Sequence, residues 1–340
     1  MEQRGNFLAT DIDVTRSAHW RVVLMYTALV VSIASICSTI IFFLFLYTPT
    51  NTALLNAVMV LLRIPTPEEQ VAEVEVYVPP VPTQIAEVVA PSTTAFSFMV
   101  QDTVGGAVLI SQKPDAVWPL ASITKLMTAL VILDMQPDYS TTTVVIGADS
   151  LDSFMYAGDT YTYQELWDAM LIGSSNKAAL TLATALGGSE GAFVSLMNEK
   201  ARTLGLSTST VFVDASGLSD GNVGTARDVS ILVQKAMVQE KIAQTVRTKS
   251  VVLFSKERKK QREILTTNWL LTGWIPNTLQ LVGGKTGHTL AAAYNFTMVT
   301  YDEAHTRPIS VVVLGAQTHE ARFTEALALA QSVWQSYQWP

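Results

Sequence analysis

The chain has 340 residues, of which 49% are hydrophobic and 15% charged, and its formal net charge is −7. Its mean hydropathy is +0.29, so the composition argues against a wholly disordered chain and against a nucleic-acid-binding protein that relies on bulk positive charge. A single cysteine, Cys37, excludes an intrachain disulfide framework and a cysteine-rich metal site.

Much of the hydrophobicity lies in residues 22–47, a run of 26 residues without a charge. As a helix, such a run is about 39 Å long, enough to cross a hydrocarbon layer of about 30 Å. The run therefore predicts a transmembrane helix. The alternative is a cleavable signal peptide, but its apolar region is normally about 7–15 residues and ends in small residues. The length of this run favours a retained anchor.

The basic residues predict the orientation of this helix. Arg4, Arg16 and Arg21 precede the run, and the first basic residue after it is Arg63. By the positive-inside rule, residues 1–21 are a cytoplasmic tail and the rest of the chain is extracytoplasmic.

Residues 48–92 have the composition of a linker. Ala53–Leu62 is apolar but too short to span a membrane, and it could be an interfacial helix, a continuation of the anchor or a contact surface. Residues 64–94 contain six prolines and five glutamates but no lysine or arginine. Such a stretch cannot bury enough to fold alone, which predicts an extended acidic linker. Residues 93–340, with 18 basic and 21 acidic residues, then form the folded domain.

The folded part begins with strands, continues with helices and returns to strands. Alternation and the glycine pair 105–106 predict a hairpin, and helical spacing with capping and stop residues predicts the helices that follow. The first strands are Ala95–Val100 and Ala107–Ile110; the helices are Ser122–Met135, Thr162–Leu171, Asn176–Leu186, Ser189–Leu204 and Thr225–Met237; the later strands are Ser250–Phe254, Leu279–Thr286, Ala293–Thr300 and Ile309–Gly315; and Thr318–Tyr337 is the final helix.

Strands at both ends of the domain with helices inserted between them predict an α+β fold. We expect an antiparallel sheet flanked by helices, with an inserted helical lobe. The basic run Lys256–Lys260 falls between two strand-like segments and is interpreted as a solvated hairpin turn.

Ser122-Ile-Thr-Lys125 is the first motif that can carry chemistry. A spacing of three puts both side chains on one helix face, so the lysine amine can reach the serine hydroxyl. A serine hydroxyl is a weak nucleophile until a base takes its proton, and a neutral lysine can do so if its pKa falls from about 10.4. Taken alone, the motif is weak and is better interpreted as an N-cap serine and a solvated lysine.

Two further motifs change this interpretation. Ser174-Ser-Asn176 lies in the break between two predicted helices, and Lys285-Thr-Gly287 lies at the end of a predicted strand. In this order and separation, the three motifs form the set found in β-lactamases and penicillin-binding proteins.

Residues 93–338 resemble the low-molecular-mass penicillin-binding proteins, the D-alanyl-D-alanine carboxypeptidase and endopeptidase group of serine peptidases. Beyond the three motifs, the resemblance extends to Trp118–Ala129, Phe212–Leu218, Thr225–Asp228 and Asn268–Leu271. Ala291–Asn295 departs from the family's usual pattern after the third motif.

This resemblance implies the catalytic residues. Ser122 would be the acylated nucleophile and Lys125 its base, while Ser174 and Asn176 would relay protons and hold the substrate amide. These four residues are the catalytic set.

The resemblance also implies the substrate-binding residues. Lys285 and Thr286 would meet the terminal carboxylate from an edge strand that includes Gly287, and the backbone N–H of His288 would complete an oxyanion hole with that of Ser122. Arg227 could also recognise the carboxylate, or it could form a helix-capping salt bridge with Asp228.

The function implied is a serine-type D-alanyl-D-alanine carboxypeptidase that acts on peptidoglycan stem peptides and is acylated by β-lactams. Held to the lipid bilayer by residues 22–47, it would be a single-pass protein of the bacterial cytoplasmic membrane. The alternatives are a D-Ala crosslink endopeptidase, then a β-lactamase or an inactive penicillin-binding wall scaffold. Neither a nucleic acid nor a cofactor is expected as a partner. No metal is expected, because the four histidines, His19, His288, His305 and His319, lack metal-ligand spacing. Trp167, Trp269, Trp274 and Trp334 are interpreted as core or rim residues rather than a sugar platform.

Overall fold

The computed structural model describes Met25, residues 27–36, 38–40 and 42–43, and residues 79–301 and 307–339. The chain divides into two compact units, Met1–Tyr77 and Val78–Pro340.

In the first unit, the described positions between Met25 and Phe43 are helical, and their large apolar side chains are exposed. Among the residues that the structure describes, no single helix is long and apolar enough to cross a membrane; the apolar helix Thr27–Ile40 is shorter than that. The tail 1–21, the remaining positions of 22–47 and the linker residues 48–78, including 53–62, lie outside the described residues.

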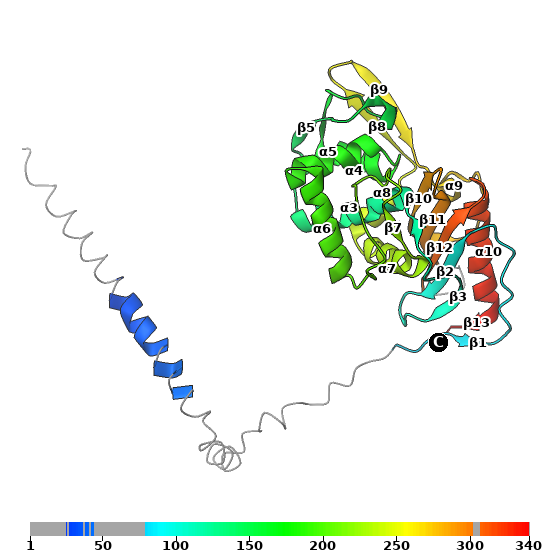
Figure 1. The fold of residues 1–340 in the computed structure, drawn as a ribbon, viewed down its shortest axis with the longest axis horizontal. Helices are drawn as coiled ribbons and strands as arrows, with labels where there is room; N and C mark the ends of the chain where they lie inside the picture. The colour runs from blue at the N-terminus through cyan, green and yellow to red at the C-terminus, as the bar shows by residue number, and fades with distance from the viewer. Residues whose placement is uncertain are drawn as a thin grey trace, which may run out of the picture. The chain divides into compact units, whose positions relative to one another are not determined.

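The second unit is built on a five-stranded antiparallel sheet in the order β10-β11-β12-β2-β3 (Figure 1). The strands are β2 (Ser97–Asp102), β3 (Val108–Gln112), β10 (Gln280–Thr289), β11 (Ala293–Tyr301) and β12 (Ile309–Ala316). Every residue of the central strand β12 is buried. Because side chains alternate along a strand, Val311 and Val313 pack in one core cluster and Val312 and Leu314 in the other. β10 forms one edge of the sheet.

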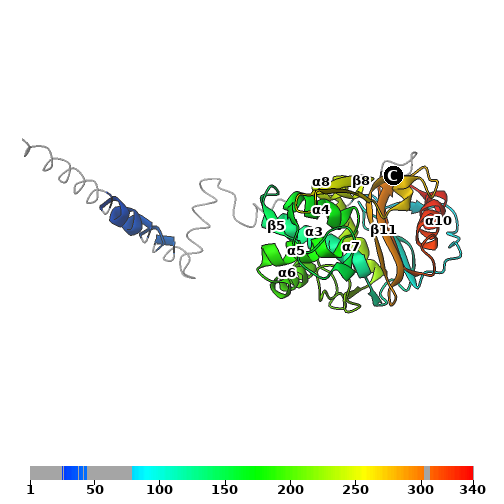
Figure 2. The same cartoon turned by 90° about the horizontal axis from the view of Figure 1, so that it is seen from above.

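Helices cover both faces of this sheet (Figure 2). Helix α10 (Ala321–Ser336) packs on one face, and α7 (Ala226–Met237) and α8 (Glu240–Val246) pack on the other. On the side of α7, the chain forms the helical lobe. It consists of α3 (Thr124–Met135), α4 (Tyr163–Leu171), α5 (Asn176–Gly187) and α6 (Glu190–Thr203).

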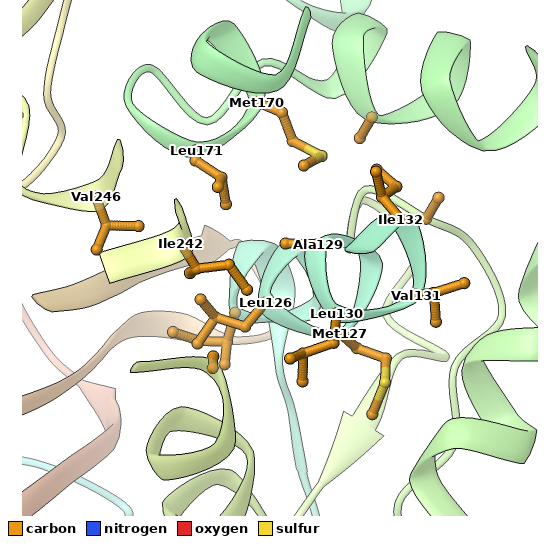
Figure 3. Packing of buried hydrophobic residues seen from close by; sticks show 14 of the residues in the cluster. Leu126, Met127, Ala129, Leu130, Val131, Ile132, Met170, Leu171, Ile242 and Val246 are labelled. Atoms are coloured by element: carbon orange, nitrogen blue, oxygen red, sulfur yellow. The ribbon is translucent and has the colours of Figure 1, made fainter. Parts of the chain in front are cut away.

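Helix α3 is the centre of the lobe. Nine of its 12 residues are buried, because α4, α5, α6 and α7 all contact it. Figure 3 shows Leu126 and Ala129 of α3 among Met170 and Leu171 of α4 and Ile242 of α8. A helix buried over its first nine residues cannot shift without disturbing several neighbours, so α3 is a rigid support for the residues at its N-terminus.

Short elements complete the unit. They are paired strands, two 3-10 turns and one short helix: β1 (Thr83–Gln84) with β13 (Tyr337–Gln338), β4 (Trp118–Pro119) with β7 (Val223–Gly224), β5 (Thr142–Val144) with β6 (Thr160–Thr162), β8 (Ser250–Ser255) with β9 (Lys260–Leu265), η1 (Ala121–Ile123), η2 (Asp149–Leu151) and α9 (Trp269–Thr272).

The α+β class, the antiparallel sheet and the helical lobe agree with the sequence prediction. Thr162 caps α4 through the predicted capping box with Glu165, and Lys256–Lys260 lies at the turn of the β8–β9 hairpin. Strand β9 is the second strand-like segment of that hairpin. Helix α8 was not predicted, because it is short and lacks clear periodicity.

Residues 79–92, which the sequence assigns to the linker, lie against the domain. Strand β1 pairs with β13, and the backbone N–H of Ile85 donates to the carbonyl of Ser336. Next to them, Thr94 donates to the Glu325 carboxylate of α10 through its N–H (2.8 Å) and its hydroxyl (2.6 Å). Composition did not reveal this packing, because it rests on backbone groups and one distant glutamate.

Candidate active site

Ser122 is held at the entrance of α3 by an unusual backbone. It lies in the 3-10 turn η1, directly after Ala121, whose φ of +49° is in the left-handed region. Gly217 approaches this point so closely that a Cβ on it would lie 1.9 Å from the Ala121 carbonyl oxygen. The side-chain amide of Asn295 donates to the carbonyl of Leu120 (3.1 Å). The nucleophile segment is thus fixed by contacts on both sides.

Lys125, one turn further along, is fully buried and its amine has three oxygen neighbours. Its Nζ lies 2.9 Å from Ser122 Oγ, 2.7 Å from Asn176 Oδ1 and 2.6 Å from the Ser216 carbonyl oxygen. Asn176 donates its own Nδ2 to the Leu151 carbonyl (3.1 Å), which turns Oδ1 toward the lysine.

Burial lowers the pKa of Lys125 to about 7, although the carboxylates of Asp214 and Asp152 favour the charged form. A neutral amine has two N–H bonds and one lone pair. Asn176 Oδ1 and the Ser216 carbonyl oxygen can only accept, so they take the two N–H groups. The lone pair of neutral Lys125 therefore faces the Ser122 hydroxyl, which can donate its proton to it.

The loop around Asp214 presents the Ser216 carbonyl to this amine. Asp214 Oδ1 accepts from the N–H groups of Ser216 (2.7 Å) and Gly217 (2.6 Å), and Oδ2 accepts from the N–H of Ser219 (2.7 Å). These hydrogen bonds hold the pKa of the half-buried Asp214 below its usual range, although burial acts in the opposite direction.

Ser174 lies in the break between α4 and α5 with φ +63°, and its Oγ accepts a hydrogen bond of 2.8 Å from Lys285 Nζ. The residue after it, Ser175, caps α5 by accepting from the Ala178 N–H. Lys285 is buried, and burial followed by the charges of Lys125 and Arg322 lowers its pKa well below the ordinary value. The second and third motifs therefore meet at one hydrogen bond.

A cavity of about 470 Å³ opens over these residues. Ser122, Ser174, Thr286, Gly287 and His288 line it. Lys125 and Lys285 each contact one of the two serines, and Asn176 contacts Lys125. The structure thus brings eight of the nine predicted site residues together. Within the described ranges, no group of three or more His, Cys, Asp or Glu could hold a metal ion.

Arg227 is the exception, because neither role predicted for it is seen. Its guanidinium binds the exposed Asp115 (2.6 and 3.0 Å) and does not line the cavity. Asp228 instead accepts hydrogen bonds from Ser207 and Thr210. Because successive helix residues point about 100° apart, the burial of Ala226 and Asp228 at the start of α7 directs Arg227 outward.

The guanidinium that lines the cavity is that of Arg322 on α10. Its Nη1 donates to the Gly287 carbonyl (3.2 Å) and its Nη2 lies 2.7 Å from His319 Nε2. Since an arginine only donates, His319 Nε2 accepts. Burial, the Arg322 charge and His288 lower the pKa of His319 to about 4, so the ring is neutral. The sequence signal for Arg322 was a basic residue within a mostly apolar segment, the predicted final helix Thr318–Tyr337.

Three other residues of the cavity were not predicted as site residues from the sequence. Thr267 Oγ1 lies 2.7 Å from Thr286 Oγ1, Tyr294 stacks on His288 with a centroid distance of 4.3 Å, and Trp269 lines the wall. Tyr294 belongs to the segment Ala291–Asn295 that departs from the family pattern.

A buried lysine whose neutral amine faces a serine, beside a second serine–lysine pair and an edge strand, defines a serine enzyme of the penicillin-binding class. Residues 84–318 match the family model of peptidase S11, described as D-alanyl-D-alanine carboxypeptidase. The chain belongs to this family, as the resemblance predicted.

Individual relatives agree with this assignment. The chain is 34% identical over 238 residues to a D-alanyl-D-alanine endopeptidase of Pseudomonas aeruginosa, covering 68% of this chain and 75% of the relative. It is 33% identical over 253 residues to the D-alanyl-D-alanine carboxypeptidase DacC of Escherichia coli, covering 70% of this chain and 60% of the relative.

Among solved structures, penicillin-binding protein D2 of Listeria monocytogenes in its ampicillin-bound form is similar, with a TM-score of 0.63 and 29% identity. That match covers 72% of this chain and 98% of the Listeria chain.

Proposed function

We propose that this chain removes the terminal D-alanine from peptidoglycan stem peptides through an acyl-enzyme on Ser122. The observation that carries the proposal is the buried amine of Lys125, whose lone pair faces Ser122 Oγ at 2.9 Å beside the cavity. Family membership supplies the reaction class.

In the first step, Lys125 Nζ takes the hydroxyl proton as Ser122 Oγ attacks the carbonyl carbon of the penultimate D-alanine. The carbonyl oxygen becomes an oxyanion, which the backbone N–H groups of Ser122 and His288 stabilise; each such donor is worth about 3–4 kcal/mol in well-studied hydrolases. The position of Ser122 at a helix entrance and of His288 on the edge strand β10 supports this assignment.

In the second step, the C–N bond breaks and free D-alanine leaves. Ser174 gives the departing amine a proton and receives in exchange the proton that Lys125 took from Ser122, so Lys125 is neutral again; the hydrogen bond from Lys285 to Ser174 Oγ supports this role. Water then attacks the acyl-enzyme, Lys125 again accepts a proton, and Ser122 Oγ is released with its hydrogen restored.

The terminal carboxylate of the substrate binds Thr286 and Arg322. Both line the cavity with Ser122, and Arg322 stays charged at neutral pH even though burial lowers its pKa to about 10. A charged donor in a largely buried site binds a carboxylate strongly, so the enzyme prefers substrates with a free C-terminus.

A crosslink endopeptidase is the second candidate. The relative from Pseudomonas aeruginosa carries that name, and the two activities share the same acylation step. They differ only in which amine leaves.

The proposal is tested with the purified full chain and diacetyl-Lys-D-Ala-D-Ala. Ser122→Ala removes the nucleophile, so D-alanine release and labelling by fluorescent penicillin should both disappear. Ser140→Ala changes an exposed serine and serves as the matched control. Unchanged labelling of the Ser122→Ala protein would falsify the proposal, and a crosslinked dimer assayed in parallel separates carboxypeptidase from endopeptidase activity.

Arg322→Gln should raise KM for the same peptide by about tenfold to a hundredfold, because a charge-assisted hydrogen bond is worth about 1.5–3 kcal/mol. Arg227→Gln changes the guanidinium that faces Asp115 and should leave KM within about twofold, since surface ion pairs contribute little. Steady-state kinetics of the two variants provide the measurement. The assignment is wrong if the Arg227 variant is the impaired one.

The pKa of Lys125 near 7 predicts the pH dependence of acylation. Only the neutral amine accepts the serine proton, so the second-order rate of acylation by benzylpenicillin should level off above pH 7 and fall about tenfold per pH unit below it. Stopped-flow measurements between about pH 5 and pH 9 cover both the falling part of the rate profile and its plateau. A flat profile over that range would contradict a lysine base, provided that melting temperatures show a folded protein throughout.

We also propose that residues 22–47 anchor the enzyme to the bacterial cytoplasmic membrane, with residues 1–21 inside and the catalytic domain outside. The uncharged run of 26 residues and the preceding arginines support this proposal. Deleting residues 1–47 should move the protein from the membrane to the soluble fraction, whereas deleting residues 1–15 should not. The proposal is contradicted if the full-length chain is found in the soluble fraction when membranes are separated without carbonate treatment.

A further inference from the structure

Trp269 and Trp274 form an aromatic shelf beside the cavity. Helix α9 starts at Trp269 after the Asn268 cap and ends at Thr272, and the residue that follows it, Gly273, has a φ of +81°. This left-handed residue turns the chain back, so that the Trp274 ring lies 5.0 Å from that of Trp269, centroid to centroid. A glycine is suited to such a turn, and the two indoles form one surface.

The core holds this shelf in place. Leu270 and Ile275, the residues that follow each tryptophan, are buried in the cluster beneath α10. Trp269 also stacks on Phe323 of α10 with a centroid distance of 6.0 Å. Figure 1 shows α9 beside the upper ends of β10 and α10. The shelf is therefore preorganised rather than a loose loop.

The shelf continues the wall of the cavity. Trp269 lines the cavity, and its ring lies 4.0 Å from that of His319, which accepts a hydrogen bond from Arg322. Trp274 is 70% exposed. A row of rings thus leads from the guanidinium in the cavity to an exposed indole, and such an exposed apolar surface beside a binding cavity favours a ligand that covers it.

The position of Arg322 decides which part of the substrate meets the shelf. In the proposed function, on which this inference rests, Thr286 and Arg322 bind the carboxylate of the residue that leaves. Trp269 contacts the histidine bonded to that arginine, so the shelf lies on the leaving-group side of Ser122 and not on the acyl side.

We propose that the aromatic shelf binds the side chain of the leaving amino acid and favours a D-amino acid with an unbranched aliphatic side chain over D-alanine. The methyl group of D-alanine offers little surface to an indole, whereas a chain of three or four carbons is long enough to cover a ring face. Covering these ring faces with methylene groups removes apolar surface from water.

The test compares two peptides, diacetyl-Lys-D-Ala-D-Ala and the same peptide ending in D-norleucine, with the purified full chain. Wild type should show the lower KM for the D-norleucine peptide. Trp274→Ala should raise KM for that peptide about tenfold more than for the D-alanine peptide, as expected for one lost apolar contact. Because the shelf contacts no reacting atom, the loss should fall on KM rather than on kcat.

Trp274→Phe keeps an aromatic face and should retain most of the preference. Phe254→Ala removes another exposed aromatic ring, on the β8–β9 hairpin, and should leave both KM values unchanged. The inference is overturned if wild type shows no preference for D-norleucine, or if Trp274→Ala changes both KM values equally.

The two proposals fail in different ways. If D-alanine is released but the enzyme shows no preference among leaving groups, the shelf proposal is contradicted and the proposed function stands. If neither peptide is cleaved and penicillin does not label Ser122, the proposed function falls and the shelf proposal falls with it.

Discussion

The site depends on burying one amine, that of Lys125. A charged ammonium is costly to remove from water, so burial lowers the pKa of this lysine to about 7, and the neutral amine still needs acceptors for its N–H groups. Asn176 supplies one from the start of α5, and Ser216 supplies the other from the loop organised by Asp214. Ser122 then meets the remaining lone pair. One nitrogen atom thus fixes the relative positions of three segments that are far apart in sequence.

The two layers of the domain meet at this point. The helical lobe supplies Ser122, Lys125 and Ser174, whereas the sheet supplies Lys285 from its edge strand β10. Asn295 of β11 reaches across to the carbonyl of Leu120, which ties the nucleophile segment to the sheet. The lobe is rigid because nine of the 12 residues of α3 are buried, and β12 is buried along its whole length. Catalytic geometry is therefore set by packing around the site as much as by hydrogen bonds within it.

Membership of the D-alanyl-D-alanine carboxypeptidase family defines the acylation chemistry but leaves the leaving group open. Relatives of similar identity are named carboxypeptidase and endopeptidase, so differences between them must lie outside the shared motifs. In the proposed function, His319 and Trp269, which line the cavity with Arg322, lie on the leaving-group side, where the substrates of these two activities differ. Enzymes that share this fold can therefore differ in substrate specificity through residues at the edge of the cavity.

The sequence by itself determined the fold class, the order of most helices and strands, and eight residues of the site, because periodicity, capping residues and three short motifs are local signals. Only the tertiary structure showed that Arg322, rather than Arg227, faces the cavity, because the direction of a helical side chain depends on which face of that helix is buried. It also decided that residues 79–94 pack on the domain and that Trp274 is exposed beside Trp269. These outcomes rest on contacts between residues distant in the chain, such as Thr94 with Glu325 and Trp269 with His319, and no local pattern encodes such contacts.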